Sequence, residues 1–458
     1  MIRPDDTIAA IATPLGEGGL AVVRVSGREA LRVADHCFVP VGRHSRKPGD
    51  AATHTVHYGR IQLGDQVADE VLLTVLRAPR TYTREDTVEM ACHGGMLPAR
   101  LVLEACLAAG ARLAEPGEFT RKAFLNGRLD LAQAEAVADV IHARTELALT
   151  AAQEQLAGSL SKRIRQLRQD LLQVLAHVEA HISFPDEDIA PDTREALLGR
   201  LRSAEAFMDE LLRTAREGRL LRRGIRAALI GRTNAGKSSL LNALLGRDRA
   251  IVTATPGTTR DTIEETASIR GLPVVLIDTA GLREAGDAIE EEGIRRSQRA
   301  LAEAELVLHV LDGSEPRDVR DEGWMERLAD RPRIVVLNKS DLPGRAGLAA
   351  QAGLRVVETS CLTRVGIETL KDAIRETVWS GAIRAEMLEV TINARHQDAL
   401  RRAREAVELT LAALERGESL ELVAVDLHAA VRAVGEIVGE TTTDDLLDSI
   451  FSQFCIGK

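Results

Sequence analysis

An eight-residue stretch, Gly231-Arg232-Thr233-Asn234-Ala235-Gly236-Lys237-Ser238, constrains the fold of this chain more than any other feature. It matches the pattern G-x-x-x-x-G-K-[ST] of a phosphate-binding loop. The apolar run Ile225–Ile230 before it predicts a buried strand, and Ser239–Leu245 after it predicts a helix. Backbone N–H groups of such a loop and the positive end of the following helix bind phosphate oxygens. We therefore expect Lys237 to contact the β- and γ-phosphates and the Ser238 hydroxyl to bind Mg²⁺.

Two further segments predict the rest of a phosphate and magnesium site. Asp278-Thr279-Ala280-Gly281 follows the apolar run Val274–Ile277. There an Asp can hold a water on Mg²⁺, and the Gly281 N–H can contact the γ-phosphate. Thr258-Thr259-Arg260-Asp261 lies between the loop and Asp278, where a switch threonine would complete the Mg²⁺ shell.

Two segments near the end of this region indicate that the base is guanine. Asn338-Lys339-Ser340-Asp341 follows the apolar run Ile334–Leu337. The Asp341 carboxylate can accept hydrogen bonds from both N1–H and N2–H of guanine, and adenine offers no such pair of donors. Because an unpaired buried carboxylate is costly, discrimination by a factor of about 10⁴ is attainable. Ser360-Cys361 follows a short apolar run and falls where a backbone N–H would contact guanine O6. The order of these segments predicts a GTPase.

Leu282 stands where many G proteins carry the glutamine that orients the attacking water. Leucine has no polar atom for that task, so either hydrolysis is slow or another group supplies the function. The loop Thr253–Thr259 offers several oxygens, which together with the Asn234 side chain can enclose a monovalent cation. A fixed positive charge there would act as an arginine finger does, an effect of about 10³ to 10⁵ in rate.

Composition argues against several other classes of protein. The 458 residues, 45% of them apolar, are enough for about three domains with hydrophobic cores. There is no apolar run of about 18 residues, so we expect no membrane span. Five scattered cysteines without a C-x-x-C pattern argue against a disulfide framework or a zinc site and indicate the cytoplasm. The net charge of −10 argues against a simple polyanion binder.

The changing pattern along the chain predicts a multidomain α/β and α architecture. Residues 1–118 contain short segments bounded by Gly, Pro or Asp, which are typical of strands in an α+β domain. Residues 119–219 have the apolar spacing of helices. Residues 220–380 alternate strands and helices, as a parallel sheet covered on both faces does. Since residues 381–458 return to helices, we expect a helical domain interrupted by an inserted Ras-like P-loop GTPase domain.

The motifs along the whole chain resemble the family of bacterial tRNA modification GTPases called MnmE or TrmE, in the TRAFAC class of G proteins. The matching segments are Asp6-Thr7-Ile8, Ala12-Thr13-Pro14, Arg24-Val25-Ser26-Gly27, His93-Gly94-Gly95, Pro116-Gly117-Glu118-Phe119, Arg121–Asn126, Leu129–Glu135, Asn234–Ser238, Pro256–Asp261 and Phe454-Cys455-Ile456-Gly457-Lys458. The last segment is the most diagnostic, because other G proteins lack it.

The resemblance implies a biochemical setting. Members are homodimers held by N-terminal domains that bind a tetrahydrofolate, 5,10-methylenetetrahydrofolate or 5-formyltetrahydrofolate. They work with the flavoprotein MnmG (also GidA), which carries FAD, in what we expect to be a heterotetramer. Together the two proteins add a carboxymethylaminomethyl group to C5 of the wobble uridine of certain tRNAs. GTP hydrolysis depends on K⁺ and on dimerisation of the G domains, which drives a conformational cycle.

Carried over by position, the resemblance assigns residues of the G domain. Catalysis falls on Glu290, Lys237 and Thr259, with Glu291 and Glu292 as alternatives to Glu290 if the register differs. Mg²⁺ falls to Ser238 and Thr259, and K⁺ to Asn234, Thr253, Thr255 and Thr258. With the motifs above, the expected nucleotide-binding residues are Asn234, Ala235, Gly236, Lys237, Ser238, Ser239, Thr253, Thr258, Thr259, Asp278, Thr279, Ala280, Gly281, Asn338, Lys339, Asp341, Ser360 and Cys361.

The resemblance places the folate contacts on Arg24, Glu89, Arg128 and Lys458. From the pattern alone, Arg24 and Glu89 belong on the solvent face of a sheet. The resemblance favours the ligand role, in which Glu89 suits the amide and amino group of a pterin and Arg24 and Arg128 suit the glutamate tail. Arg128 departs from the family, which often has Lys there. Cys455 either acts chemically or packs.

Two alternative functions share the G-domain motifs. A ribosome-assembly GTPase would bind RNA through an appended basic domain, and this acidic chain shows none. A folate-dependent one-carbon transferase would use the G domain only for regulation. Binding of 5-formyltetrahydrofolate separates the first alternative from the other functions, and analysis of wobble uridines separates the second from tRNA modification.

Overall fold

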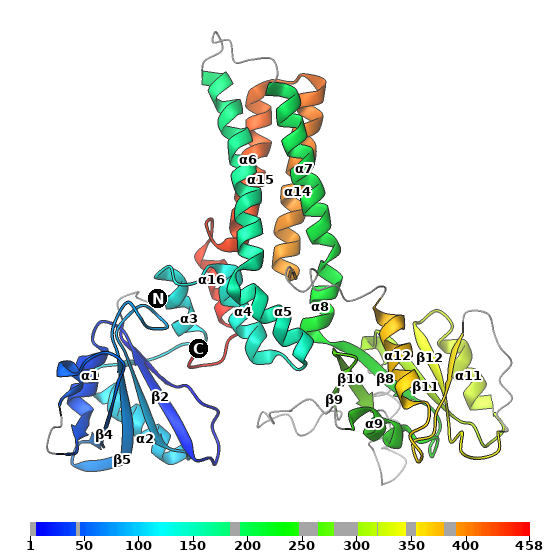
Figure 1. The fold of residues 1–458 in the computed structure, drawn as a ribbon, viewed down its shortest axis with the longest axis horizontal. Coiled ribbons are helices and arrows are strands. Elements are labelled where there is room, and N and C mark those ends of the chain that lie inside the picture. The colour runs from blue at the N-terminus through cyan, green and yellow to red at the C-terminus, as the bar shows by residue number, and fades with distance from the viewer. Residues whose placement is uncertain are drawn as a thin grey trace. The chain divides into compact units, whose positions relative to one another are not determined.

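The computed structural model describes residues 6–42, 46–183, 193–246, 264–278, 301–317, 319–344, 354–379 and 391–458 (Figure 1). The chain divides into two compact units. Unit 1 comprises Met1–Ala138 and Gly435–Lys458, and unit 2 comprises Asp139–Val434. None of the helices in the described ranges combines the length and the hydrophobicity that a membrane-spanning helix needs.

Unit 1 is built on a seven-stranded sheet in the order β3-β4-β5-β6-β2-β1-β7. Neighbouring strands are antiparallel except β1 and β7, which are parallel. The strands are β1 (Ile8–Ile11), β2 (Leu20–Ser26), β3 (Phe38–Pro40), β4 (Thr55–Leu63), β5 (Gln66–Leu76), β6 (Thr87–His93) and β7 (Arg112–Leu113). Helices α1 (Ala30–Cys37) and α2 (Met96–Ala108) bury their apolar residues against the sheet in one hydrophobic cluster.

The C-terminal segment is part of the core of unit 1. Helix α3 (Glu118–Leu125), the start of α4 (Leu131–His142) and α16 (Asp444–Phe451) meet in a cluster of apolar side chains. Gly117 precedes α3 with φ of +69°, and a Cβ there would lie 2.5 Å from the Phe451 carbonyl oxygen. Only glycine satisfies both the backbone conformation and the close approach. The last residues are thereby held beside α3 and the sheet.

Unit 2 contains long helices of the kind that the three- or four-residue apolar spacing predicts. They are α5 (Glu146–Ala157), α6 (Ser159–Ser183), α7 (Thr193–Arg213), α8 (Ala215–Arg223), α14 (Ala394–Arg416) and α15 (Leu420–Val438), of which α15 continues into unit 1. Figure 1 shows α6, α7, α14 and α15 running side by side. Leu160, Ile164, Leu167 and Leu171 of α6 are all buried, as their spacing along one helix face requires.

The rest of unit 2 is a six-stranded sheet in the order β13-β12-β11-β8-β10-β9. The strands are β8 (Ile225–Ile230), β9 (Glu264–Ile269), β10 (Leu272–Asp278), β11 (Leu306–Asp312), β12 (Arg333–Asn338) and β13 (Arg355–Glu358). The sheet is parallel as expected, except that the edge strand β9 is antiparallel to β10. The described helices of this part are α9 (Lys237–Leu245), α11 (Val319–Arg327) and α12 (Ile367–Val378). The predicted fold class, an α+β part followed by helices that an α/β part interrupts, is confirmed.

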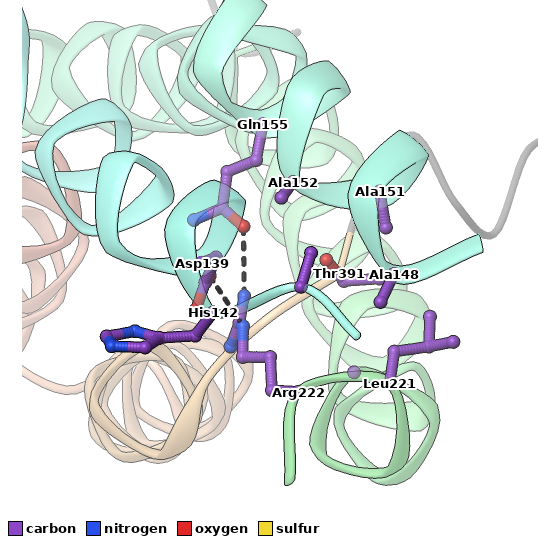
Figure 2. Close-up of a pocket in the computed structure, with 11 residues that line it drawn as sticks. Asp139, His142, Ala148, Ala151, Ala152, Gln155, Leu221, Arg222 and Thr391 are labelled. Carbon is purple, nitrogen blue, oxygen red and sulfur yellow. Dashed lines mark hydrogen bonds and ion pairs between the residues drawn. The ribbon is translucent and has the colours of Figure 1, made fainter. Parts of the chain in front are cut away.

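Helices α5 and α8 join the helical part of unit 2 to its sheet. Leu220 and Leu221 of α8 and Ala151 of α5 belong to the same buried cluster as the strands. Figure 2 shows a polar contact beside them: the Arg222 Nε lies 2.7 Å from Asp139 Oδ2, and Nη2 donates to Gln155 Oε1 at 2.9 Å. The hollow that these side chains line holds about 20 Å³, room for one water molecule. These contacts fix the C-terminal end of α8, which directly precedes β8.

Candidate functional site

The loop between β8 and α9 has the backbone of a phosphate cradle. Gly231 has φ of +152°, and a Cβ there would lie 2.0 Å from the Val310 carbonyl oxygen. Gly236 has φ of +95°, and a Cβ would lie 2.1 Å from Asn338 Nδ2. Asn234 adopts a positive φ of +65° without being glycine, which places it among the uncommon backbone conformations found at functional sites. Both glycines are thus required by space as well as by conformation.

Lys237, the first residue of α9, is held over this loop. Its ammonium donates to the Gly231 carbonyl at 2.8 Å and to the Arg232 carbonyl at 2.7 Å, and the residue is only 7% exposed. The neighbouring Asn234, Ser238 and Ser239 are exposed. A buried ammonium and the N-terminal end of α9 therefore supply positive charge to a loop whose polar residues are exposed.

Two segments that the sequence predicts to bind guanine, residues 338–341 (the guanine segment) and 360–361, lie against the same loop. Asn338 is 2% exposed; its Nδ2 donates to the Ala235 carbonyl at 2.9 Å, and its Oδ1 accepts from the Cys361 N–H at 3.3 Å. Ser360 is fully buried, and its Oγ accepts from the Thr363 N–H. Burial is the largest cause that raises the pKa of the Cys361 thiol, and the nearby Asp341 carboxylate adds to it. Segments 231–238, 338–341 and 360–361 therefore meet at the carboxyl ends of β8, β12 and β13, where α/β sheets bind their ligands.

Asp312, at the end of β11, fixes the second residue of the guanine segment. Its carboxylate forms an ion pair with Lys339 and accepts from the Ser314 N–H at 3.0 Å and from Ser314 Oγ at 2.6 Å. These partners hold the pKa of the Asp312 carboxyl below its ordinary value although burial opposes them as the largest single cause. Lys339 itself has a positive φ of +64°. The aliphatic chain of Lys339 is thus anchored by its charged end.

Part of the predicted site lies outside the described residues. Asp278 ends β10, next to β8, with Asp278 opposite Leu229, so its backbone reaches the same edge of the sheet. The other predicted residues are not described: Thr253, Thr255, Thr258, Thr259, Thr279, Ala280, Gly281, Glu290, Glu291 and Glu292, with Leu282 and Pro256. The assignments to K⁺, to the catalytic glutamate and to half of the Mg²⁺ shell therefore stay predictions. The residues that are described, Asn234 and Ser238, present exposed oxygens that suit hard cations.

A second polar cluster lies in unit 1, on the sheet face opposite α1 and α2. Arg24 of β2 and Glu89 of β6 are directly opposite each other in the strand register. The Arg24 Nε lies 2.8 Å from Glu89 Oε1, and the two side chains are 17% and 32% exposed. Arg24 Nη1 also donates to the Gly457 carbonyl at 3.3 Å. This pair is therefore partly enclosed, whereas the sequence pattern alone placed it on an open sheet face.

Two aromatic rings enclose the cluster. The Arg24 guanidinium lies 5.6 Å from the centre of the Phe119 ring and 6.0 Å from that of Tyr82. Arg128 lies 4.7 Å from the Tyr82 ring centre and donates from Nη1 to the Tyr82 carbonyl at 2.9 Å. Burial raises the pKa of the Tyr82 hydroxyl, which hydrogen-bonds to Thr120 at 2.9 Å. Aromatic faces beside guanidinium groups and a carboxylate can bind a flat heterocycle that carries an amide.

The C-terminal residues approach the same cluster. The Phe119 N–H donates to the Lys458 carbonyl at 3.2 Å, and the Gly117 N–H donates to the Cys455 carbonyl at 3.4 Å. Gly457 has φ of +94°, and a Cβ there would lie 2.7 Å from the Ile11 carbonyl oxygen. Lys458 is half-buried and Cys455 is exposed. Of the four predicted folate residues, Arg24 and Arg128 thus lie against Tyr82, Glu89 pairs with Arg24, and Lys458 is connected to Phe119 through its backbone carbonyl. Cys455 lies nearby in the chain and is exposed.

Sequence reasoning missed the two aromatic residues of this cluster. Phe119 lies inside a segment that carries the family resemblance, but no role was assigned to it. Tyr82 lies in no recognised motif. The signal that points to Tyr82 is scarcity: the chain has 2 tyrosines, and aromatic residues make up 2% of it, so an aromatic residue in a polar, Thr- and Arg-rich turn stands out.

Known proteins match this chain over both the N-terminal region and the region that contains the nucleotide site. Residues 7–128 match the family model of the GTP-binding protein TrmE N-terminus, and residues 131–455 match that of the MnmE helical domain. The chain is 47% identical over 461 residues to the tRNA modification GTPase MnmE of Geobacillus kaustophilus, covering 99% of both chains. This chain belongs to the tRNA modification GTPase MnmE family. The members of this family are GTPases that act in tRNA modification. This chain is therefore a GTPase that acts in tRNA modification.

Further relatives agree over the same length. MnmE of Chloroflexus aurantiacus is 49% identical over 459 residues, covering 99% of this chain and all of that one, and MnmE of Bacillus subtilis is 44% identical over 460 residues with the same coverage. Among solved structures, Aquifex aeolicus Era bound to GDP and AlF₄⁻ is 26% identical, with a TM-score of 0.27, over 40% of this chain and 66% of that one. The G domain of the T. maritima FeoB iron transporter is 29% identical, with a TM-score of 0.26, over 33% and 98%. At such TM-scores the likeness says nothing of the whole fold.

Proposed function

We propose that this chain hydrolyses GTP in order to help build the carboxymethylaminomethyl group at C5 of the wobble uridine, position 34, of certain tRNAs. In this proposal a tetrahydrofolate supplies the one-carbon unit, and the flavoprotein MnmG, with its FAD, is the partner in a heterotetramer. The cluster around Arg24 and Glu89 is the observation that supports folate use. Its carboxylate, guanidinium groups and aromatic rings suit a pterin with an acidic tail, and a GTPase needs none of them.

The test is chemical analysis of tRNA. In cells that lack the gene, wobble uridines should lose the carboxymethylaminomethyl group, and a plasmid copy of the gene should restore it. A Glu89→Gln copy should fail to restore it although its GTP turnover is normal. Unchanged wobble uridines in the deletion strain would refute the proposal and favour a ribosome-assembly role, which ribosome profiles of the same strain would show.

The proposal includes K⁺ as the activating ion and Mg²⁺ as the ion of the bound GTP. The polar residues Asn234 and Ser238 support it, and Thr253, Thr255, Thr258 and Thr259 are the other proposed ligands. Glu290 is the proposed catalytic glutamate. Replacing K⁺ by Na⁺ should slow GTP turnover at least tenfold with little change in GTP affinity, because the cation stabilises charge in the transition state. Equal turnover in both salts would rule out the cation cage.

The proposal also includes a homodimer formed through unit 1. Exposed apolar residues on the outer face of its sheet support this: Leu20 is 66%, Val56 60%, Tyr58 49% and Leu72 49% exposed, and Tyr58 and Leu72 are opposite each other in the register. A face of this kind on a soluble protein is a candidate interface. Leu72→Glu should shift the molecular mass in light scattering from dimer to monomer, and an unchanged mass would exclude this face.

The division of the chain belongs to the same proposal: residues 1–118 for folate and dimerisation, 119–219 and 381–458 for the helical domain, and 220–380 for the G domain. The proposed compartment is the cytoplasm. It is supported by the five cysteines, which are all free in the structure.

A further inference from the structure

Arg232 is the second residue of the phosphate-binding loop, and its side chain is bound to residues outside that loop. Its Nε lies 3.0 Å from Asp321 Oδ2, and its Nη1 lies 3.8 Å from Glu315 Oε2. Its Nη2 donates to the Pro316 carbonyl at 3.5 Å. These partners all belong to the connection between β11 and α11 or to the first turn of α11 (Figure 1). The loop pattern G-x-x-x-x-G-K-[ST] asks for no particular residue at this position.

The ion pair between Arg232 and Asp321 is largely buried. The Asp321 side chain is 1% exposed and that of Arg232 is 16% exposed. A buried carboxylate is strongly disfavoured unless a cation or several donors satisfy it, so its charged partner is held in place. Asp321 also lies in the first turn of α11, where the helix dipole favours an anion. Arg232 is therefore bound to a fixed acceptor.

The backbone of Arg232 connects the ion pair with Asp321 to Lys237. Its carbonyl oxygen accepts from Lys237 Nζ at 2.7 Å, and the Gly231 carbonyl accepts from the same ammonium at 2.8 Å. A displacement of Arg232 would therefore move both the loop backbone and the ammonium that we expect to contact phosphate.

The same connection is fixed at its other end to the guanine segment. It starts at Asp312, whose carboxylate pairs with Lys339 and accepts from Ser314. The Gly313 N–H donates to the Asn338 carbonyl at 2.7 Å. The β11–α11 connection thus contacts the guanine segment near its beginning and the phosphate loop, through Arg232, near its end.

We propose that Arg232 and Asp321 are positioning residues for nucleotide binding, which set the phosphate loop at the correct distance from the guanine segment. A nucleotide must satisfy both segments at once, so a misplaced loop weakens binding of GDP and GTP alike. The pair touches neither the base nor the phosphates by this account. It acts through the Arg232 backbone and Lys237.

The test measures fluorescent mant-GDP binding to the full chain. Arg232→Gln and Asp321→Asn should each weaken mant-GDP binding about tenfold, mainly through faster dissociation. The affinity of the double variant should be no lower than that of the single variant that binds less tightly. Such non-additivity is the signature of one shared interaction. Arg232→Lys keeps the charge but not the planar fork, so it should bind with an intermediate affinity. It also serves as the measurable variant if Arg232→Gln does not fold.

The matched control is the ion pair between Arg270 and Asp372, 2.6 Å apart, which joins the β9–β10 turn to α12 in the same part of unit 2. Arg270→Gln and Asp372→Asn should leave mant-GDP affinity within twofold of the wild type. The proposal is overturned if the Arg232 and Asp321 variants also bind within twofold of the wild type. It is equally overturned if their effects on affinity add in the double variant, or if the control variants lose as much affinity.

Discussion

The two candidate sites of this chain are built in different ways. The nucleotide site of unit 2 is made of loops that each follow one strand of a parallel sheet, and backbone groups such as the Ala235 carbonyl and the Cys361 N–H connect them. The cluster of unit 1 is made of side chains from two strands, a turn and α3, to which the C-terminal segment adds the backbone carbonyl of Gly457. In the first site the geometry is carried by the backbone, and in the second by packing between distant segments.

This difference predicts how the two sites respond to change. A site made of backbone groups depends on glycines and on a few buried anchors, and most of its side chains can vary. A site made of side chains depends on each of them and on the fold that brings them together. A substitution in one site should therefore leave the other site intact.

Asp341→Asn should have the largest effect. The variant lacks the carboxylate that we propose accepts two hydrogen bonds from guanine, and each bond to a charged acceptor contributes about 1.5–3 kcal/mol. GTP affinity should therefore fall about 10²- to 10⁴-fold in competition with mant-GDP, and xanthosine triphosphate should bind better than GTP. Binding of 5-formyltetrahydrofolate should not change. A variant that still prefers GTP would show that Asp341 does not read the base.

Acid should destabilise the sheet of unit 2 through His309 of β11. The ring is 0% exposed, neither ring nitrogen has a hydrogen-bond partner among the described residues, and burial followed by the charge of Arg333 lowers its pKa to about 4. Between that value and the ordinary pKa of about 6.5 the unfolded chain binds the proton and the folded chain does not. Stability should thus fall by about 2 kcal/mol from pH 7 to pH 5.

Tryptophan fluorescence can follow this effect in urea, because the chain's 2 tryptophans, Trp324 and Trp379, both lie in the α/β part of unit 2. His309→Leu should flatten the pH dependence of the unfolding free energy. An equal slope in the wild type and the variant would show that other groups cause it.

Tyr82→Leu should have the smallest effect of the three. It removes the ring that lies against Arg24 and Arg128, and such a cation–π contact contributes about 0.5–2 kcal/mol. Affinity for 5-formyltetrahydrofolate should fall about tenfold while GTP turnover stays the same. Tyr82→Phe keeps the ring and should bind within about twofold of the wild type. If Tyr82→Phe loses as much affinity as Tyr82→Leu, the hydroxyl and not the ring matters.

The same difference explains what the sequence could predict. The strand Ile225–Ile230 was predicted with the bounds that the structure shows, because a run that is apolar except for Arg226 and precedes a glycine-rich loop has few other interpretations. Strand β6 ends at His93, because residues 91–93 pair with β2 in a way that no local pattern reveals. Short elements such as β1 and α1 were not predicted, because four to eight residues carry too weak a period.

The cluster of unit 1 was predictable only in part. Arg24 and Glu89 were named from a family resemblance, but their direct pairing depends on the register of β2 and β6. The carbonyl of Gly457 reaches Arg24 across 433 positions of sequence. No periodicity or spacing encodes such a contact, since it follows from how α3 and α16 pack. Tyr82 was missed for the same reason.

We propose that one chain carries a nucleotide site and, separately, a folate site around Glu89. Equilibrium titration of the full-length protein with 5-formyltetrahydrofolate tests it most directly. The wild type should bind one equivalent per chain, and Glu89→Gln should weaken binding at least thirtyfold while its GTP turnover stays within twofold of the wild type. A wild-type protein that does not bind the folate, or a Glu89→Gln variant that binds it equally well, would contradict the claim.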